Sequence, residues 1–144
     1  MVMRVVLDTN VLVAGLRSRN GAGFQILSML PERRFLPLLS VPLVLEYEAV
    51  LKRDQQISAH GISPGDIDAL LDVWIACCDP VRLYYLWRPQ LSDNDDEMVL
   101  ETAINGRANG IVTYNLRDFD PAARKFGLSV YRPAHFLDTL RQRI

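Results

Sequence analysis

The chain has 144 residues, of which 49% are hydrophobic and 23% are charged. This is the composition of an ordinary globular protein, and it excludes intrinsic disorder, collagen-like repeats and low-complexity structure. The formal net charge of −1 excludes a strong overall attraction to nucleic acid, although local clusters of charge can still bind it. The length predicts one domain over residues 1–144 with a substantial hydrophobic core.

The sequence carries no signal for a membrane or an export pathway. No apolar run is long enough for a transmembrane helix, and the apolar stretch at the start is too short for a signal peptide. The two cysteines, Cys77 and Cys78, are adjacent, so no disulfide framework is expected. These features predict a cytoplasmic protein with reduced thiols.

Strands and helices alternate in the first half of the sequence. Residues 5–7 form an apolar, β-branched run that predicts a buried strand ending at Asp8. We expect Asn10 to cap a helix over residues 11–16. The further predicted elements are a loop over 17–23, a helix over 24–30 that Pro31 stops, a strand over 35–39, a helix from its cap Ser40 to about Lys52, and a polar connection over 53–62.

The second half continues the same alternation. Ser63 opens a helix with an apolar face, and Pro80 ends that segment. The further predicted elements are a strand over 81–86, a polar stretch over 90–95, a helix over about 95–107, a strand over 110–113, a strand over 128–131 and a helix over 133–143. Since no tight hairpin joins two strands, the pattern predicts an α/β fold with a mostly parallel sheet of about five strands between layers of helices.

Acidic residues follow several of the predicted strands, and the ligands of such folds lie at the carboxyl ends of the strands. Asp8 follows the first strand, Glu46 lies on the helix after the second, an acidic cluster lies beyond the third, and Asp118 comes after the fourth. Glycine-rich phosphate loops are absent from these junctions, which argues against a nucleotide cofactor. Carboxylates gathered in this way favour a hard cation, so we expect Mg²⁺ or Mn²⁺.

Four short motifs occur in order along the chain. They are Asp8-Thr9-Asn10, the segment from Ser40 to Glu46, Asp93-x-x-Asp96 with Leu100 and Ala103, and Thr113-x-Asn115-x-x-Asp118-Phe119. Together they resemble the PIN-domain family over essentially the whole chain. The similarity is greatest to single-domain prokaryotic PIN proteins that serve as toxins of toxin–antitoxin pairs (VapC-like).

This resemblance implies a Rossmann-like PIN domain and a Mg²⁺- or Mn²⁺-dependent endoribonuclease that leaves a 5′-phosphate and a 3′-hydroxyl. The implied catalytic and metal-binding acids are Asp8, Glu46, Asp96 and Asp118. The implied supporting residues are Asp93 as an auxiliary acid, with Thr9, Asn10, Ser40, Thr113 and Asn115 as hydroxyls and amides that orient carboxylates or a phosphate. The implied partners are an RNA substrate, an antitoxin protein and a second copy of the chain.

Asn115 departs from the family pattern, because many PIN domains carry Asp at this position. An amide supplies no charge, so a second metal position is in question. One alternative is therefore a weakened PIN fold that only binds RNA or a protein, and another is a phosphatase with Asp8 as nucleophile. On loops near the expected site, the candidates for holding the RNA backbone are Arg17, Arg19, Arg88 and Arg117. Apolar positions on the helices of residues 63–78 and 133–143 are the basis for expecting a homodimer.

Overall fold

The computed structural model describes residues 2–84, 90–91 and 93–143. Its five strands are β1 (Met3–Leu7), β2 (Phe35–Leu39), β3 (Asp79–Pro80), β4 (Gly110–Val112) and β5 (Ser129–Tyr131). The helices are α1 (Thr9–Arg17), α2 (Ala22–Ser28), the one-turn 3₁₀ helix η1 (Leu30–Glu32), α3 (Val41–Leu51), α4 (Asp54–His60), α5 (Pro64–Cys77), α6 (Asn94–Asn105), α7 (Leu116–Lys125) and α8 (Pro133–Gln142).

The described strands form one sheet in the order β3-β2-β1-β4-β5, and every neighbouring pair is parallel. Strand β1 lies at the centre because its residues are apolar enough to be buried on both faces, with Val5 and Val6 fully inaccessible to solvent. The α/β, mostly parallel architecture predicted from the alternation of elements is thereby confirmed.

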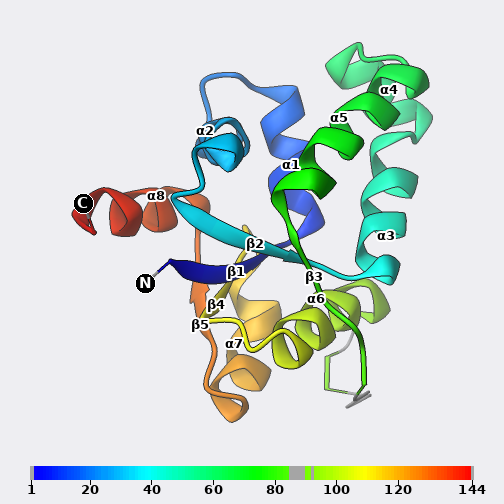
Figure 1. The fold of residues 1–144 in the computed structure, drawn as a ribbon. Helices are drawn as coiled ribbons and strands as arrows, with labels where there is room; N and C mark the ends of the chain where they lie inside the picture. Colours follow the sequence, from blue (N-terminus) through cyan, green and yellow to red (C-terminus); the bar gives the residue numbers. More distant parts are fainter. Residues whose placement is uncertain (1, 85–89, 92, 144) are drawn as a thin grey trace.

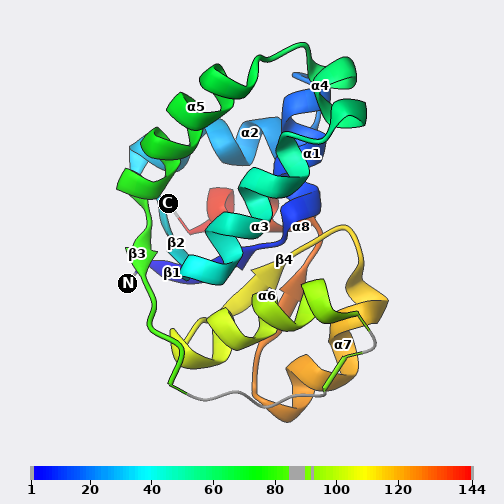
Figure 2. The same cartoon turned by 90° about the vertical axis from the view of Figure 1, so that its right-hand side faces the viewer.

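Helices cover both faces of this sheet (Figure 1). Helices α6 and α7 lie on one face, while α1, α2 and α5 lie on the other, and α8 packs beside α2. Figure 2 shows α3 next to both α1 and α6, which it contacts. The carboxyl ends of β1 and β4 and the first turns of α1 and α6 therefore meet close to α3.

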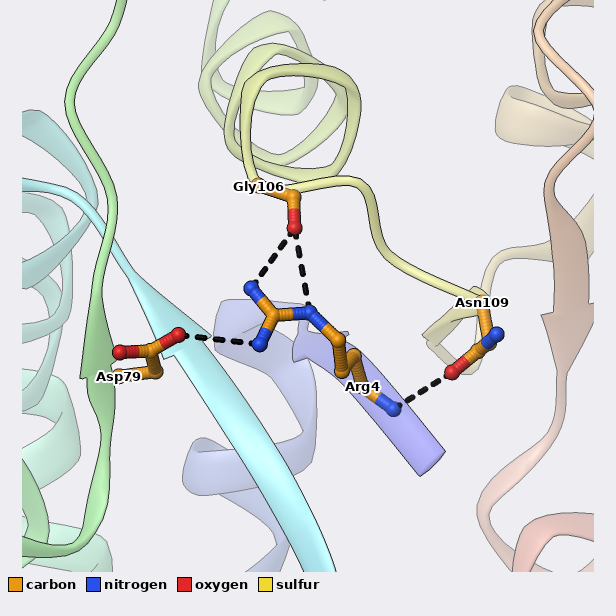
Figure 3. Close-up of polar contacts among 4 residues, drawn as sticks. All are labelled: Arg4, Asp79, Gly106 and Asn109. Atoms are coloured by element: carbon orange, nitrogen blue, oxygen red, sulfur yellow. Dashed lines mark hydrogen bonds and ion pairs between the residues drawn. The ribbon is translucent and has the colours of Figure 1, made fainter. Parts of the chain in front are cut away.

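Arg4 fixes the carboxyl end of α6 to the sheet (Figure 3). Its guanidinium group donates from Nε and Nη2 to the carbonyl oxygen of Gly106, at 3.3 and 2.8 Å, and forms a 3.0 Å ion pair with Asp79. The backbone nitrogen of Arg4 donates to Asn109 Oδ1 at 2.7 Å. A single side chain thus joins β1, β3 and the turn between α6 and β4.

Gly106 is required where α6 meets the sheet. A Cβ atom at this position would lie 2.8 Å from Leu38 Cδ1, 2.8 Å from Val81 Cγ2 and 2.9 Å from the carbonyl oxygen of Thr102. Real Cβ atoms do not approach their neighbours this closely, so only glycine allows α6 to pack at this depth.

Several predicted boundaries were wrong, beginning with residues 53–62. This segment contains α4, which ends at Gly61 in a left-handed conformation with φ of 73°. Helix α4 has no buried residue, so the hydrophobic periodicity by which buried helices are detected is missing. The helix predicted over 24–30 is instead α2 followed by η1, and Pro31 lies within η1.

The other differences involve prolines. The strand expected over 81–86 is instead the short β3 at Asp79–Pro80; residues 81–84 lie outside it, and 85–86 lie outside the described residues. Helix α7 was not predicted, because Pro121 in its interior is a helix-breaking signal. The helix forms nevertheless, since Phe119, Ala122 and Ala123 bury one face of it.

A candidate acidic active site

Acidic side chains line a hollow of about 210 Å³ at the carboxyl edge of the sheet. Asp8 reaches it from the end of β1, Glu46 from α3, and Asp95 and Asp96 from the first turn of α6. Thr9, Asn10 and Asn115 also line it. Three of the four acids predicted as metal ligands therefore surround one space, although they come from distant parts of the sequence.

Asp118 and Asp93 lie around this hollow without lining it. Asp118 is exposed in the first turn of α7, and its negative charge raises the pKa of both Asp8 and Asp96. Asp93 is the N-cap of α6, where its Oδ1 accepts from the backbone nitrogen of Asp95 at 2.8 Å. Its charge also raises the pKa of Asp8, Glu46 and Asp96.

Asp8 is held by Thr113 across the centre of the sheet. The Thr113 hydroxyl donates to Asp8 Oδ2 at 2.7 Å. The same hydroxyl oxygen accepts from the backbone nitrogen of Asn115 at 2.9 Å and from Asn10 Nδ2 at 3.3 Å. A hydroxyl has one hydrogen and two lone pairs, so these two donors occupy the lone pairs and direct the hydrogen at Asp8.

Asn10 does not cap α1 as the sequence suggested. The helix begins at Thr9, with Asp8 as the residue before it, so Asn10 lies in the first turn. Its side chain instead spans to the segment after β4, where Oδ1 accepts from the backbone nitrogen of Tyr114 at 3.3 Å. Asn10 and Thr113 thus bind each other and fix the two segments that flank Asp8.

Ser40 acts away from the hollow. It is buried at 2% exposure and caps α3, since its Oγ accepts from the backbone nitrogen of Leu43 at 3.4 Å. Its hydroxyl lies 2.7 Å from Thr102 Oγ1. Because Thr102 donates its own hydrogen to the carbonyl oxygen of Met98, Ser40 is the donor of this pair. Ser40 therefore joins α3 to α6, and with them the helices that carry Glu46 and Asp96.

Sequence reasoning missed two residues at the site. Asp95 lines the hollow, and among charged neighbours it has the largest effect in raising the pKa of Glu46; the run of acids at 95–97 was its signal. Tyr47 is buried at 6% exposure and donates its hydroxyl hydrogen to the carbonyl oxygen of Leu7, which ties α3 to the end of β1. No pattern in the sequence distinguished Tyr47 from an ordinary core aromatic.

Burial and mutual repulsion disfavour ionisation of the acids at this site. Burial, followed by the charges of Asp8, Asp93, Asp118 and Asp95, raises the pKa of Asp96 to about 7. Burial likewise raises the pKa of Asp8, although the hydrogen bonds from Thr113 and the Thr9 backbone oppose this. The pKa of Glu46 is raised for the same leading reason, and Arg53 only partly offsets it. The site is therefore short of positive charge.

The donor set is made of carboxylate, amide and hydroxyl oxygens, which suit a hard divalent cation and not zinc. Within the described residues, however, no group of three or more acidic, His or Cys side chains is already close enough to hold an ion. The chemistry of the donors therefore fits Mg²⁺ or Mn²⁺, and the carboxylates would have to move toward such an ion.

The arginines predicted near this edge do not line the hollow where the structure describes them. Arg19 and Arg117 are exposed, and Arg17 donates from Nε to Gln56 Oε1 at 3.0 Å. Arg88 lies outside the described residues. Backbone contacts of RNA with Arg17, Arg19 and Arg117 stay a prediction.

The parallel sheet and the acids at its carboxyl edge define a Rossmann-like α/β protein with an acidic site. A family model described as PIN domain matches residues 4–117. The chain belongs to the PIN domain family, as the motifs predicted. No curated protein sequence matched the chain significantly.

The fold is also similar to a solved structure. This is a chain in the crystal structure of VapBC2 from Rickettsia felis bound to a DNA fragment from their promoter, with a TM-score of 0.61 and 15% sequence identity. The match covers 90% of the present chain and 98% of the other. Among the helices that the structure describes, none combines the length and apolar character needed to cross a bilayer.

Proposed function

We propose that this protein is an endoribonuclease that depends on Mg²⁺ or Mn²⁺, and that residues 1–144 form a single PIN domain. The observation that carries the proposal is the hollow lined by Asp8, Glu46 and Asp96, whose pKa values are all raised because burial and repulsion are not balanced by positive charge. Catalytic acids in hydrolases that use divalent ions have this need for a cation.

Asp8, Glu46, Asp96 and Asp118 are the residues that would hold the ion. When bound, a divalent ion lowers the pKa of a bound water and stabilises negative charge on a phosphodiester. The chain's own residues then orient and exchange protons. Thr113 keeps the Asp8 carboxylate in one orientation, and Asp96, whose pKa is about 7, can accept a proton from an attacking water near neutral pH.

The proposal is tested with a labelled single-stranded RNA incubated with Mg²⁺, Mn²⁺ or a chelator. We expect cleavage only with metal, and loss of cleavage in Asp8→Asn and Asp96→Asn variants. Asp72→Asn is the matched control, because Asp72 is an exposed acid on α5. Metal-dependent cleavage that persists in a purified, folded Asp8→Asn protein would refute the assignment.

Asn115 makes a binding module the second candidate, because an amide lines the hollow where related proteins carry an acid. RNA binding without any cleavage in Mn²⁺ would favour that function. A phosphatase that uses Asp8 as nucleophile has less support. Such an enzyme needs a lysine at its site, and both lysines of the sequence lie elsewhere: Lys52 pairs with Asp68 at 2.6 Å, and Lys125 donates to Gln90 at 3.1 Å.

We also propose that the protein is the toxin component of a cytoplasmic toxin–antitoxin pair and that it forms a homodimer. The similarity of the fold to VapBC2, which was solved with promoter DNA, supports a partner protein. Of the apolar residues first considered for a dimer, Phe136, Leu137 and Leu140 belong to the core. Val41, Leu45 and Ile75 are exposed instead, at 70%, 58% and 43%. Light scattering tests the dimer, since a mass near 16.3 kDa would show a monomer.

A further inference from the structure

A second hollow, of about 380 Å³, lies at the opposite end of α6 from the acids. It is lined by Arg4, Arg82, Tyr84, Asn105 and Arg107, among others, and it shares no lining residue with the acidic hollow. The 12 residues of α6 make a helix about 18 Å long. One helix therefore carries an acidic hollow at its start and a hollow with three arginines at its end.

Two of these three arginines have no partner in the described part of the chain. Arg4 is neutralised by Asp79 and bound to the carbonyl oxygen of Gly106 (Figure 3). Arg82 and Arg107 are exposed, and their side chains make no hydrogen bond or ion pair with the described residues. The hollow thus presents two positive charges that the fold does not use.

The backbone at Arg107 is in a conformation that favours glycine. Its φ is 53°, and among the described non-glycine residues only Arg33, with φ of 57°, shares the left-handed region. This conformation costs an ordinary residue roughly 1 kcal/mol. Arg107 is not needed to neutralise the end of α6, because Arg4 already binds the Gly106 carbonyl. The cost is therefore unexplained by the fold, and an external ligand for the guanidinium group would explain it.

Tyr84 adds an aromatic surface beside these charges. Its side chain is 73% exposed, while its backbone nitrogen donates to Asn105 Oδ1 at 2.9 Å. The backbone of Tyr84 is thus fixed to α6 and its ring faces solvent. An exposed aromatic ring next to unpaired arginines is typical of surfaces that bind single-stranded nucleic acid, in which bases stack on the ring and phosphates contact the arginines.

We propose that Arg82, Tyr84 and Arg107 form a binding site for single-stranded RNA outside the acidic hollow. This inference rests on the proposed function, because it takes RNA as the ligand. The acidic hollow repels phosphates until a cation is bound, and the described arginines expected near it do not line it. A separate site at the other end of α6 supplies the affinity for the backbone that the acids lack, and it gives longer RNA strands an advantage over short ones.

The test measures binding of a labelled single-stranded RNA of mixed sequence at several salt concentrations, with a chelator present to prevent cleavage. The variants are Tyr84→Ala and a double variant of Arg82→Ala and Arg107→Gly. Arg33→Gly is the matched control, since it also removes an exposed arginine from a left-handed position. Glycine suits both positions, so each protein is expected to fold, which thermal unfolding checks.

We expect the double variant to lower the slope of log affinity against log salt by about 1.4, or about 0.7 for each lost phosphate contact on a single strand. Tyr84→Ala should weaken binding about fivefold or more without changing this slope. Arg33→Gly should change neither quantity. Equal slopes for the double variant and the wild type, or an equal loss in Arg33→Gly, would overturn the site.

The outcomes for this site and for the nuclease are separable. If the arginine and tyrosine variants behave as expected but no metal supports cleavage, the RNA site stands and the nuclease does not. If the wild-type protein cleaves RNA and the variants bind it normally, the nuclease stands and the RNA site fails. Normal RNA binding by the double variant with loss of binding to a polyglutamate peptide would assign the hollow to an acidic protein segment, and would also overturn the proposal.

Discussion

Asp96→Asn should make the protein more stable at neutral pH while abolishing its proposed activity. Asp96 is 9% exposed, and its pKa rises from 3.8 to about 7 in the folded state. Because the folded state holds this proton more tightly than the unfolded state, Asp96 favours folding below pH 3.8, and that contribution is lost as the pH rises to 7. Above pH 7, the ionised carboxylate opposes folding.

The magnitude follows from the width of this pH range. Each pH unit between the two pKa values changes the free energy of unfolding by up to about 1.4 kcal/mol. The full range of about three units therefore corresponds to a few kcal/mol, with about 4 kcal/mol as the upper limit. An amide of the same shape has no charge, so Asn at this position removes the dependence and the cost together.

Urea unfolding of the wild-type and Asp96→Asn proteins at pH 5 and pH 8, in the presence of a chelator, measures this effect. We expect the variant to gain stability relative to the wild type, with the larger gain at pH 8. Asp72→Asn, an exposed acid on α5, should leave the difference between the two pH values unchanged. Adding Mn²⁺ should stabilise the wild type more than the variant. A variant that is less stable than the wild type at pH 8, or a gain that does not depend on pH, would refute the reasoning.

Three further predictions follow from contacts at the site and in the core. Asn115→Asp should tighten Mn²⁺ binding in calorimetric titration and lower stability without metal, because it adds a negative charge to a hollow that already repels its own acids; unchanged affinity would show that position 115 does not contribute to metal binding. Tyr47→Phe should lower the free energy of unfolding by about 1–2 kcal/mol, measured in urea, since the buried carbonyl of Leu7 loses its donor; an unchanged stability would mean that this bond contributes little. Gly106→Ala should cost about 1–3 kcal/mol through clashes with Leu38 and Val81, whereas Gly65→Ala, which has no atom within 4 Å, should be neutral; similar thermal unfolding of the two variants would contradict the close packing of α6.

The sequence was sufficient to predict most of the sheet, because its strands are buried and apolar. Residues 35–39 were predicted with the observed boundaries of β2, and the predicted order of elements matched a parallel sheet. Helix α4 escaped prediction because it buries no residue, and α7 because it contains Pro121. Both are cases in which tertiary packing or capping outweighs local preference.

The acids of the site could be predicted for a different reason, namely that the ends of parallel strands meet at one edge. Asp8 needed only its position after β1, whereas the placement of Glu46 and Asp96 needed the family motifs. The supporting contacts could not be foreseen. The cap expected at Asn10 and the site role expected for Ser40 were local readings, while both side chains make contacts with segments at least 60 residues away. Such pairings depend on how helices cross, which residue patterns do not specify.

The bond between Asp8 and Thr113 joins residues 105 positions apart, and the backbone nitrogen of Asp8 also donates to the carbonyl oxygen of Val112 at 2.9 Å. During synthesis, the segment that carries Asp8 leaves the ribosome long before β4 does. Until β4 arrives, Asp8 has neither its hydroxyl donor nor its neighbouring strand, and the acidic hollow does not exist. A growing chain is therefore inactive through most of its translation, and any RNA close to the ribosome is spared until the central strands have paired. The order in which the chain is made thus delays activity without the help of any other molecule.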